Sequence, residues 1–434
     1  MTYEEAVQYI EQASSFGIQL GLSRITALLD ILGNPQRQYQ TIHVTGTNGK
    51  GSVTAMVTAA LEAAGYRVGR YTSPHLETYR ERIYVHGQLI SAPDFAEAIA
   101  TVQEGVNQLT ASGQEAPTTF EMLTAAAFWY FAEKKVDYAV IEVGLGGLLD
   151  STNVITPVVS IITNVDFDHM KYCGHTIGEI ATQKAGIIKA GVPVVTTATG
   201  EALQVIAKRA YAKQSRLYAL HHGFDVMPLP PGEDKTTQAI RVTTTAGKTI
   251  DVILPLLGQH QQQNGAAAVM ALLELARTRK ALTRTAICQG LAHVRWPGRF
   301  QVLTVQGKQV VIDGAHNPAG ITSFCQTYEQ VFARRPRIFV FSVLADKDYT
   351  HMIQELFRSD DEVYVAPVPN PRTADPKVLC PQLPCHATPC QSLEEAVDRA
   401  FTHATAEDVI CLVGSLYMQG VVRAYLREHY QASL

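Results

Sequence analysis

The sequence predicts an α/β protein with two domains: an N-terminal P-loop-type domain with a mostly parallel sheet flanked by helices, and a smaller C-terminal Rossmann-like α/β domain. Three observations lead to this prediction. Short β-rich stretches alternate with helical stretches, a glycine-rich loop joins the first strand to a helix, and Trp296-Pro297-Gly298 separates two such series. The length of 434 residues also exceeds one typical domain of ~100–200 residues.

The N-terminal domain is predicted to begin with two helices and to continue as a βα series. Apolar residues recur at helical spacing in 3–10 and again in 25–32. Capping-box spacing at Thr118 to Glu121 and at Thr176 to Glu179 predicts the starts of two later helices. The predicted strands of this domain lie at 41–44, 66–71, 138–143, 158–165 and 192–197.

The pattern becomes less regular after residue 200 and then resumes as a second βα series. A hairpin is expected around Ala246-Gly247, and a helix over 261–279. The predicted strands of the second series lie at 309–313, 337–343, 362–366 and 409–413. We therefore expect the domains to span 1–295 and 296–434.

Composition argues against several classes of protein. The 36 Lys and Arg against 40 Asp and Glu leave no basic footprint for nucleic acid or an anionic membrane. No apolar run approaches the ~20 residues of a membrane span, and residues 1–12 lack the basic and apolar regions of a secretory signal. Seven scattered cysteines fit a reducing compartment. A cytoplasmic location is therefore expected.

Residues 45–52, Thr-Gly-Thr-Asn-Gly-Lys-Gly-Ser, carry the clearest chemical signal. They lie between a predicted strand and a predicted helix, so backbone N–H groups and the positive end of the helix dipole face an anion. Lys50 adds a positive charge, and the Ser52 hydroxyl is placed for phosphate or metal. Gly46 stands three residues before Gly49 instead of five, which distinguishes the loop from the common P-loop. An ordinary glycine turn is the alternative.

Polar side chains follow three other predicted strands. Ser73 follows the strand at 66–71, Glu142 lies at the end of 138–143, and His169 follows 158–165. Ligands of open α/β sheets bind beyond the carboxyl ends of strands, so these side chains are expected near the phosphate loop, where they would suit Mg²⁺. Taken singly, each also fits a structural role: a turn cap, a buried carboxylate and a loop histidine.

The glycine-rich loop resembles the nucleotide loop of the Mur-ligase superfamily, whose members activate a carboxylate with ATP and couple it to an amine. Segments 72–74, 120–121, 142–153 and 168–169 resemble successive motifs of folylpolyglutamate synthases, in the same order. The resemblance runs from 28–35 to 414–417. It implies that ATP is bound by the loop residues Thr47, Asn48, Gly49, Lys50, Gly51 and Ser52.

The resemblance also implies a metal site with one or two Mg²⁺. The family's magnesium ligands match Ser73, Glu142 and His169. Lys184 by itself reads as a solvated lysine, but it matches a lysine that is carbamylated in the family, and a carbamate is an anion able to ligate a second Mg²⁺. Lys50, His169 and Lys184 are thus the implied catalytic residues.

Further residues receive roles through the same resemblance. Four more nucleotide contacts are implied: Asn264 and Arg299 with the base of ATP, and Asp313 and His316 elsewhere on the nucleotide. Without the resemblance, Asn264 reads as the cap that opens the helix over 261–279. The amino-acid side of the site matches Asp346, Lys347 and Asp348. A loop near the pterin is hypothesised to include Arg82 and Tyr84.

The resemblance implies an ATP-dependent ligase with folate, L-glutamate and ATP as small-molecule partners, working as a monomer. The terminal carboxylate of a folate glutamyl tail would become an acyl phosphate, which the amine of L-glutamate attacks. Three alternatives stay open. The enzyme could also join dihydropteroate to glutamate, it could act on a muramyl peptide, or the chain could be a switch or motor that hydrolyses ATP without forming a bond.

Overall fold

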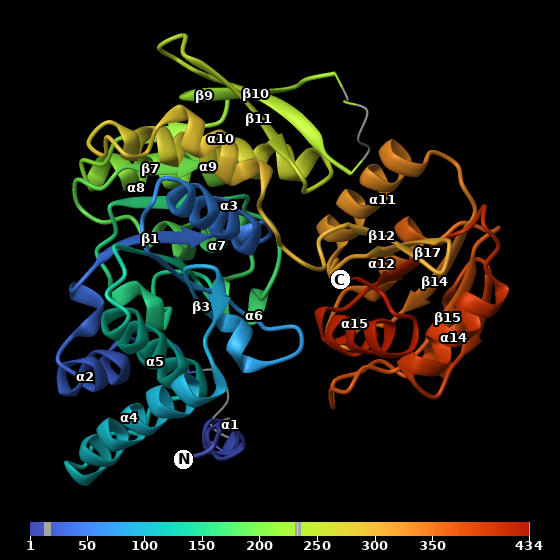
Figure 1. Cartoon of the computed structure of the whole chain (residues 1–434), viewed down its shortest axis with the longest axis horizontal. Helices are drawn as coiled ribbons and strands as arrows, with labels where there is room; N and C mark the ends of the chain where they lie inside the picture. The colour runs from blue at the N-terminus through green and yellow to red at the C-terminus, as the bar shows by residue number, and fades with distance from the viewer. Residues whose placement is uncertain (13–18, 231, 233–235, 434) are drawn as a thin grey trace. The chain divides into compact units, whose positions relative to one another are not determined.

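The computed structural model describes residues 1–12, 19–230, 232 and 236–433, and they form two compact units (Figure 1). Unit 1 comprises Met1–Leu229, Ala239–Leu254 and Gln263–Val294. Unit 2 comprises Pro230–Gln238, Pro255–Gln262 and Arg295–Leu434. The expected division between residues 295 and 296 lies beside the start of the last segment of unit 2.

Unit 1 is built on a sheet whose described strands run in the order β4-β3-β2-β5-β1-β6-β7-β8. The strands from β2 to β8 in this order are parallel, and only β3 and β4 pair in antiparallel fashion. All five predicted strands of the N-terminal domain are confirmed. The short β3, β4 and β8 were not predicted, because they carry too few residues for a clear pattern. The bounds are β1 Gln40–Thr45, β2 Val68–Tyr71, β3 Ile83–Val85, β4 Gln88–Leu89, β5 Tyr138–Glu142, β6 Val159–Ile162, β7 Val194–Thr196 and β8 Leu217–Ala219.

Helices cover both faces of this sheet, with α3 and α10 on one side and α4 and α5 on the other (Figure 1). A Cβ added at Gly290 of α10 would lie 2.4 Å from the Cα of Ala60 in α3, so the two helix backbones touch. The predicted capping boxes at Thr118 and Thr176 are both confirmed. The bounds are α1 Tyr3–Gln12, α2 Ser23–Ile31, α3 Lys50–Ala63, α4 Ala92–Ala111, α5 Thr119–Glu133, α6 Met170–Cys173, α7 Ile177–Ala185, α8 Gly200–Ala212, α9 Gln259–Ala276 and α10 Arg284–Ala292.

A separate antiparallel sheet pairs β9 Phe224–Pro228, β10 Gln238–Thr244 and β11 Thr249–Leu254. The turn between β10 and β11 holds Gly247 at a φ of 74°, which confirms the predicted hairpin. No helix in the described ranges combines the length and the hydropathy that crossing a bilayer requires. All seven cysteines are free thiols.

Unit 2 contains a second sheet, in the order β12-β13-β17-β14-β15-β16. Its buried strands feed two cores, because successive side chains point to opposite faces. In β14, Phe339 and Phe341 join the core under α11 and α12, while Ile338 and Val340 join the core under α14 and α15. The four predicted strands are confirmed. The edge strands β12 and β16 were not predicted, since neither shows the continuous apolar run of a buried strand.

The elements of unit 2 have the following bounds. The strands are β12 Gln301–Val305, β13 Lys308–Ile312, β14 Arg337–Phe341, β15 Glu362–Val365, β16 His386–Pro389 and β17 Val409–Val413. The helices are α11 Pro318–Phe332, α12 Tyr349–Leu356, α13 Pro376–Leu379, α14 Leu393–His403 and α15 Leu416–His429.

Candidate nucleotide and metal site

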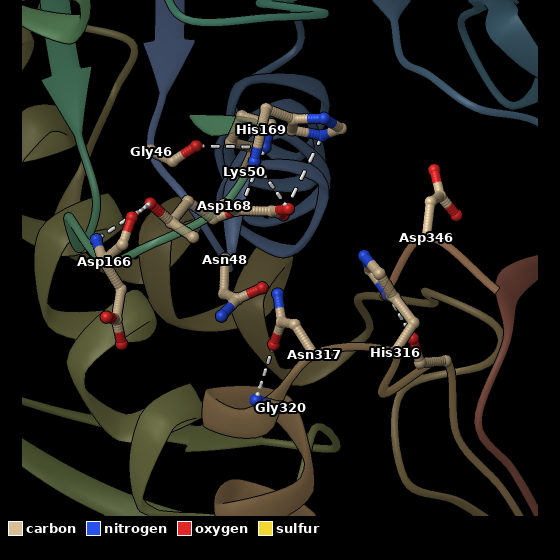
Figure 2. A network of polar contacts seen from close by, with 12 residues as sticks. Gly46, Asn48, Lys50, Asp166, Asp168, His169, His316, Asn317, Gly320 and Asp346 are labelled. Carbon is tan, nitrogen blue, oxygen red and sulfur yellow. Dashed lines mark hydrogen bonds and ion pairs between the residues drawn. The ribbon is translucent and has the colours of Figure 1, made fainter. Parts of the chain in front are cut away.

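The glycine-rich loop connects β1 to α3 as the sequence predicts. Gly46 and Gly49 have φ values of 154° and 85°, which side chains rarely adopt, and α3 begins directly at Lys50. The Lys50 ammonium donates to the carbonyl oxygens of Gly46, at 3.0 Å, and Thr47, at 3.1 Å (Figure 2). The positive charge is therefore held over the loop, at the end of the helix whose dipole favours anions.

A segment after β6 fixes the shape of this loop, and no motif in the sequence indicated this role. Asn164 accepts hydrogen bonds from Thr47 N, through its backbone oxygen at 2.9 Å, and from Asn48 N, through its side chain at 2.8 Å. The Thr163 hydroxyl donates to Asn48 O at 2.6 Å. The N–H groups of Thr47 and Asn48 are thus engaged, and the first turn of α3 supplies those that an α-helix leaves without an intrahelical acceptor.

Asn264 does not open α9 as predicted, because the helix already begins at Gln259. Its buried side chain instead packs against the phosphate loop: a Cβ added at Gly49 would lie 2.4 Å from the Asn264 Oδ1. The position one turn into the helix brings the carboxamide to the loop. This contact gives Asn264 a place in the candidate site that a cap would not have.

Replacing Gly49 with alanine is expected to weaken ATP binding by at least about tenfold while the protein stays folded. The added methyl group would collide with Asn264, and alanine is strained at a φ of 85°. Isothermal titration with a non-hydrolysable ATP analogue measures the loss. Gly247→Ala is the matched control, since that glycine also has a positive φ but no atom lies within 4 Å of the place its added methyl group would take.

Ser73 and Glu142, two of the predicted magnesium ligands, lie together. Ser73 follows β2 and Glu142 ends the neighbouring strand β5, and the Ser73 N–H donates to Glu142 Oε2 at 3.1 Å. The Glu142 residue is only 4% exposed. Adjacent parallel strands therefore bring both residues to one edge of the sheet, as the sequence predicts.

His169, the third predicted ligand, precedes α6 in a left-handed conformation with a φ of 49°. Its ring is half exposed, and its Nε2 lies 3.8 Å from Asp168 Oδ2 (Figure 2). Across the described part of the chain, no group of three or more His, Cys, Asp or Glu side chains could hold a metal ion. A hydroxyl, a carboxylate and an imidazole at Ser73, Glu142 and His169 would leave other positions of Mg²⁺ to waters and phosphate oxygens, which that ion usually takes as ligands.

Lys184 is not solvated, contrary to what its local sequence indicates. The residue is only 5% exposed at the end of α7. Burial, with the Lys50 ammonium nearby, lowers the pKa of Lys184 to about 7. The Cys173 thiol and the Asp168 carboxylate act on the pKa of Lys184 in the opposite direction. A substantial fraction of this amine is therefore neutral at physiological pH, as capture of CO₂ requires.

A buried chain of hydrogen bonds runs from His43 to the turn that follows Glu142, and the sequence did not predict it. His43 of β1 is fully buried, its Nε2 lies 2.8 Å from the Thr152 hydroxyl, and that hydroxyl donates to Asp150 Oδ1 at 2.5 Å. Asp150 Oδ2 accepts from Leu145 N at 2.8 Å. Burial lowers the pKa of His43 to about 3, so the ring stays neutral. This chain of hydrogen bonds fixes the glycine-rich turn that follows Glu142.

Within unit 2, Asp313 holds a turn instead of presenting its carboxylate to solvent. Its oxygens accept from Phe300 N at 2.6 Å and from Ala315 N at 2.8 Å, and burial raises the pKa of this carboxyl. Arg299 lies beside it, where a Cβ on Gly314 would be 2.3 Å from Arg299 Nη1. His316 Nδ1 is 2.8 Å from Gly314 O. Three of the predicted nucleotide contacts thus lie on two adjoining turns of unit 2, at 297–300 and 313–316.

The residues predicted to line the amino-acid side of the site are mostly exposed. Asp346 pairs with Arg372 at 2.7 Å, and Asp348 caps α12 and contacts His351. Lys347 lies between them, with its backbone N–H bound to Leu344 O. Within the part of unit 2 that the structure describes, these contacts are those of an ordinary polar surface.

The two residues hypothesised to lie near the pterin have different surroundings. Arg82 Nε donates to His75 Nδ1 at 2.9 Å, which places Arg82 on the segment that follows Ser73. The Tyr84 hydroxyl donates to Glu62 at 2.9 Å, and Arg70 lies over the Tyr84 ring at 4.2 Å. Tyr84 is therefore used in packing β3 against α3, while Arg82 is closer to the predicted ligands.

Comparison with known proteins identifies the family to which the chain belongs. The family model described as the Mur ligase middle domain matches residues 44–272, and that of the Mur ligase glutamate ligase domain matches 298–416. The fold and the loop therefore define a ligase of the Mur class.

Similar proteins identify the family within this class of ligases. A Bacillus subtilis dihydrofolate synthase/folylpolyglutamate synthase is 36% identical, with 98% of this chain and 99% of the relative covered. A Lacticaseibacillus casei folylpolyglutamate synthase is 38% identical, with 98% and 99% covered. The structure of the Thermotoga maritima folylpolyglutamate synthase superposes with a TM-score of 0.85 at 36% identity, over 98% of this chain and 97% of that one. The chain belongs to the folylpolyglutamate synthase family of Mur ligases.

Proposed function

We propose that this protein is an ATP-dependent ligase that adds L-glutamate to the γ-carboxylate of folate glutamyl tails through an acyl phosphate. Relatives support the choice of substrates, since one solved complex holds AMPPCP and folate, and an Escherichia coli relative, FolC, was solved with DHPP and ADP. The observation that carries the proposal is the meeting of the Lys50 loop, Ser73 and Glu142 at adjacent strand ends of one sheet.

The Lys50 loop and the strand-end residues have separate parts in this reaction. The first turn of α3 and Lys50 hold the phosphates and neutralise the γ-phosphate as it moves to the folate carboxylate. Mg²⁺ held by Ser73, Glu142 and His169 would supply further positive charge to the phosphate oxygens. The amine of L-glutamate then attacks the acyl carbon, and the amide, ADP and phosphate are released. We also assign Asn264, Arg299, Asp313 and His316 to contacts with the nucleotide.

A coupled ADP-release assay tests the proposal. Tetrahydrofolate monoglutamate, dihydropteroate and a muramyl nucleotide are each offered with and without L-glutamate. We expect ADP release only when a folate substrate and glutamate are both present, in step with the amide product detected by mass spectrometry. Release without an acceptor amine would point to an ATP-hydrolysing switch, and release with the muramyl nucleotide would point to a cell-wall ligase.

Synthesis of dihydrofolate from dihydropteroate and glutamate is the second candidate activity. It is favoured because the Bacillus subtilis relative and others are named for both activities. The dihydropteroate arm of the assay decides this point. We also propose that the protein acts as a monomer in the cytoplasm, and its free cysteines support the cytoplasmic location.

We further propose that Lys184 is carbamylated, because its amine is buried and its pKa is lowered to about 7. In ¹³C-bicarbonate the protein is expected to give a carbamate carbon signal by NMR. Lys184→Met should lose this signal, and Lys248→Met, at the exposed β10–β11 turn, should keep it. A parent spectrum without the signal at neutral to alkaline pH would refute the modification independently of any activity.

A further inference from the structure

Within unit 2, hydrogen bonds hold the backbone of the turn at 297–300 on both sides of Arg299. Before Arg299, Gly298 N donates to Gln301 Oε1 at 3.3 Å, and Gly298 O accepts from Gly314 N at 2.9 Å. After Arg299, Phe300 N donates to the buried Asp313 at 2.6 Å. The backbone on each side of Arg299 therefore has a fixed partner.

The Gln301 side chain that bonds Gly298 is itself hydrogen-bonded to α15. The same Gln301 oxygen accepts a hydrogen bond from Arg423 Nη1 at 2.8 Å, and Arg423 is only 7% exposed. A guanidinium group donates but does not accept, so it fixes which end of the Gln301 carboxamide faces Gly298. A buried arginine on the last helix thus determines a contact on a turn far away in the sequence.

The turn itself has a backbone that needs such support. Phe300 adopts a φ of 43°, which is rare for an aromatic residue, and it is buried against Phe324 with ring centroids 5.4 Å apart. The Arg299 side chain crosses Gly314, where no side chain would fit, and its Nη1 donates to Gly298 O at 3.3 Å. The direction of the Arg299 guanidinium therefore depends on the conformation of this turn.

We propose that Arg423, acting through Gln301, is a positioning residue for Arg299 and thereby sets the affinity and base preference of the site for ATP. This inference rests on the proposed nucleotide role of Arg299. Arg423 itself touches no substrate in this scheme. It holds the turn in the one conformation that presents Arg299, so that binding does not have to order the turn first.

Arg423→Met keeps most of the apolar stem and removes the donors. We expect the Kd for ATP, measured by titration calorimetry, to rise about tenfold, which corresponds to about 1.4 kcal/mol. The preference for ATP over GTP should fall, while kcat at saturating ATP and the Kd for folate stay unchanged. Arg423→Lys, which retains a donor, should restore much of the affinity. Gln301→Met should cause the same loss, and the double variant should lose no more than either single one.

Gln419→Met is the matched control. Gln419 lies one helical turn before Arg423, is fully buried, and neither of its side-chain polar atoms has a hydrogen-bond partner in the described structure. Its replacement should leave ATP affinity unchanged. If Arg423→Met lowers Tm and kcat but leaves ATP affinity and base preference intact, the positioning role is wrong.

Arg299→Met separates this inference from the proposed function. If Arg299→Met weakens ATP binding and the Arg423 and Gln301 variants do not, only the positioning role fails. If Arg299→Met leaves ATP affinity and base preference unchanged, the nucleotide role of Arg299 fails and the positioning role falls with it. Ligation of glutamate to folate by the parent enzyme tests the proposed function separately.

Discussion

Lys50→Met is expected to lower kcat for glutamate ligation by about 10²–10³-fold, the scale typical of removing one preorganised electrostatic group from a transition state. The Lys50 ammonium lies over the phosphate loop, held by the carbonyl oxygens of Gly46 and Thr47. Methionine keeps most of the length of the side chain and removes the charge and its hydrogen bonds. The ADP-release assay measures kcat, and thermal unfolding checks that the fold persists.

Lys248→Met is the control for this experiment, because Lys248 lies exposed in the turn between β10 and β11. It should ligate glutamate at the rate of the parent. A Lys50→Met enzyme that kept the parental kcat would contradict the assignment of this loop to the transferred phosphate. Such a result would leave the strand-end residues without a phosphate to act on.

Arg337→Met is expected to lower the free energy of unfolding by about 3–5 kcal/mol, because it leaves the buried Asp361 carboxylate without its partner. Arg337 Nε and Nη2 donate to the two Asp361 oxygens at 2.8 and 2.6 Å, and both side chains are only 2% exposed. Arg337 also donates to Leu356 O at 3.1 Å. Chemical denaturation followed by circular dichroism measures the loss.

Arg241→Met provides a matched comparison at the surface. Arg241 makes the same two-pronged contact with Asp251, at 2.7 and 2.7 Å, but the side chains are 42% and 41% exposed. Its loss should cost little stability compared with that of Arg337, since water solvates the remaining carboxylate. Equal losses for Arg337 and Arg241 would show that burial does not decide the strength of these pairs.

Much of the fold could be predicted because it depends on local patterns. The capping boxes at Thr118 and Thr176 place helix starts through contacts three residues apart, and the β-rich runs are long enough to identify the central strands. The edge strands β12 and β16 and the helix α10 escaped prediction. Helix α10 is stabilised by a partner distant in the sequence, since a Cβ at Gly290 would touch the backbone of Ala60 in α3. The strand β12 pairs with the neighbouring β13, and it escaped prediction because most of its residues are only partly buried.

The candidate site was also predictable only in part from the sequence. The grouping of Ser73 with Glu142 followed from one rule, that the carboxyl ends of adjacent parallel strands share an edge. The burial of Lys184 and the packing of Asn264 against Gly49 could not be read from their neighbours in the chain. Both depend on which other helix or loop covers the residue after folding.

The amino-acid sequence alone determined the conformation of the Lys50 loop and predicted phosphate binding there, because strand, glycine turn, lysine and helix start are contiguous and act through local backbone geometry. Only the tertiary structure decided the lowered pKa of Lys184 and the support of Arg299. Desolvation by distant segments lowers the pKa of Lys184, and Arg423 on the last helix reaches the turn of Arg299 through Gln301. Charge and conformation at these positions are set by neighbours in space, which the order of residues in the chain does not display.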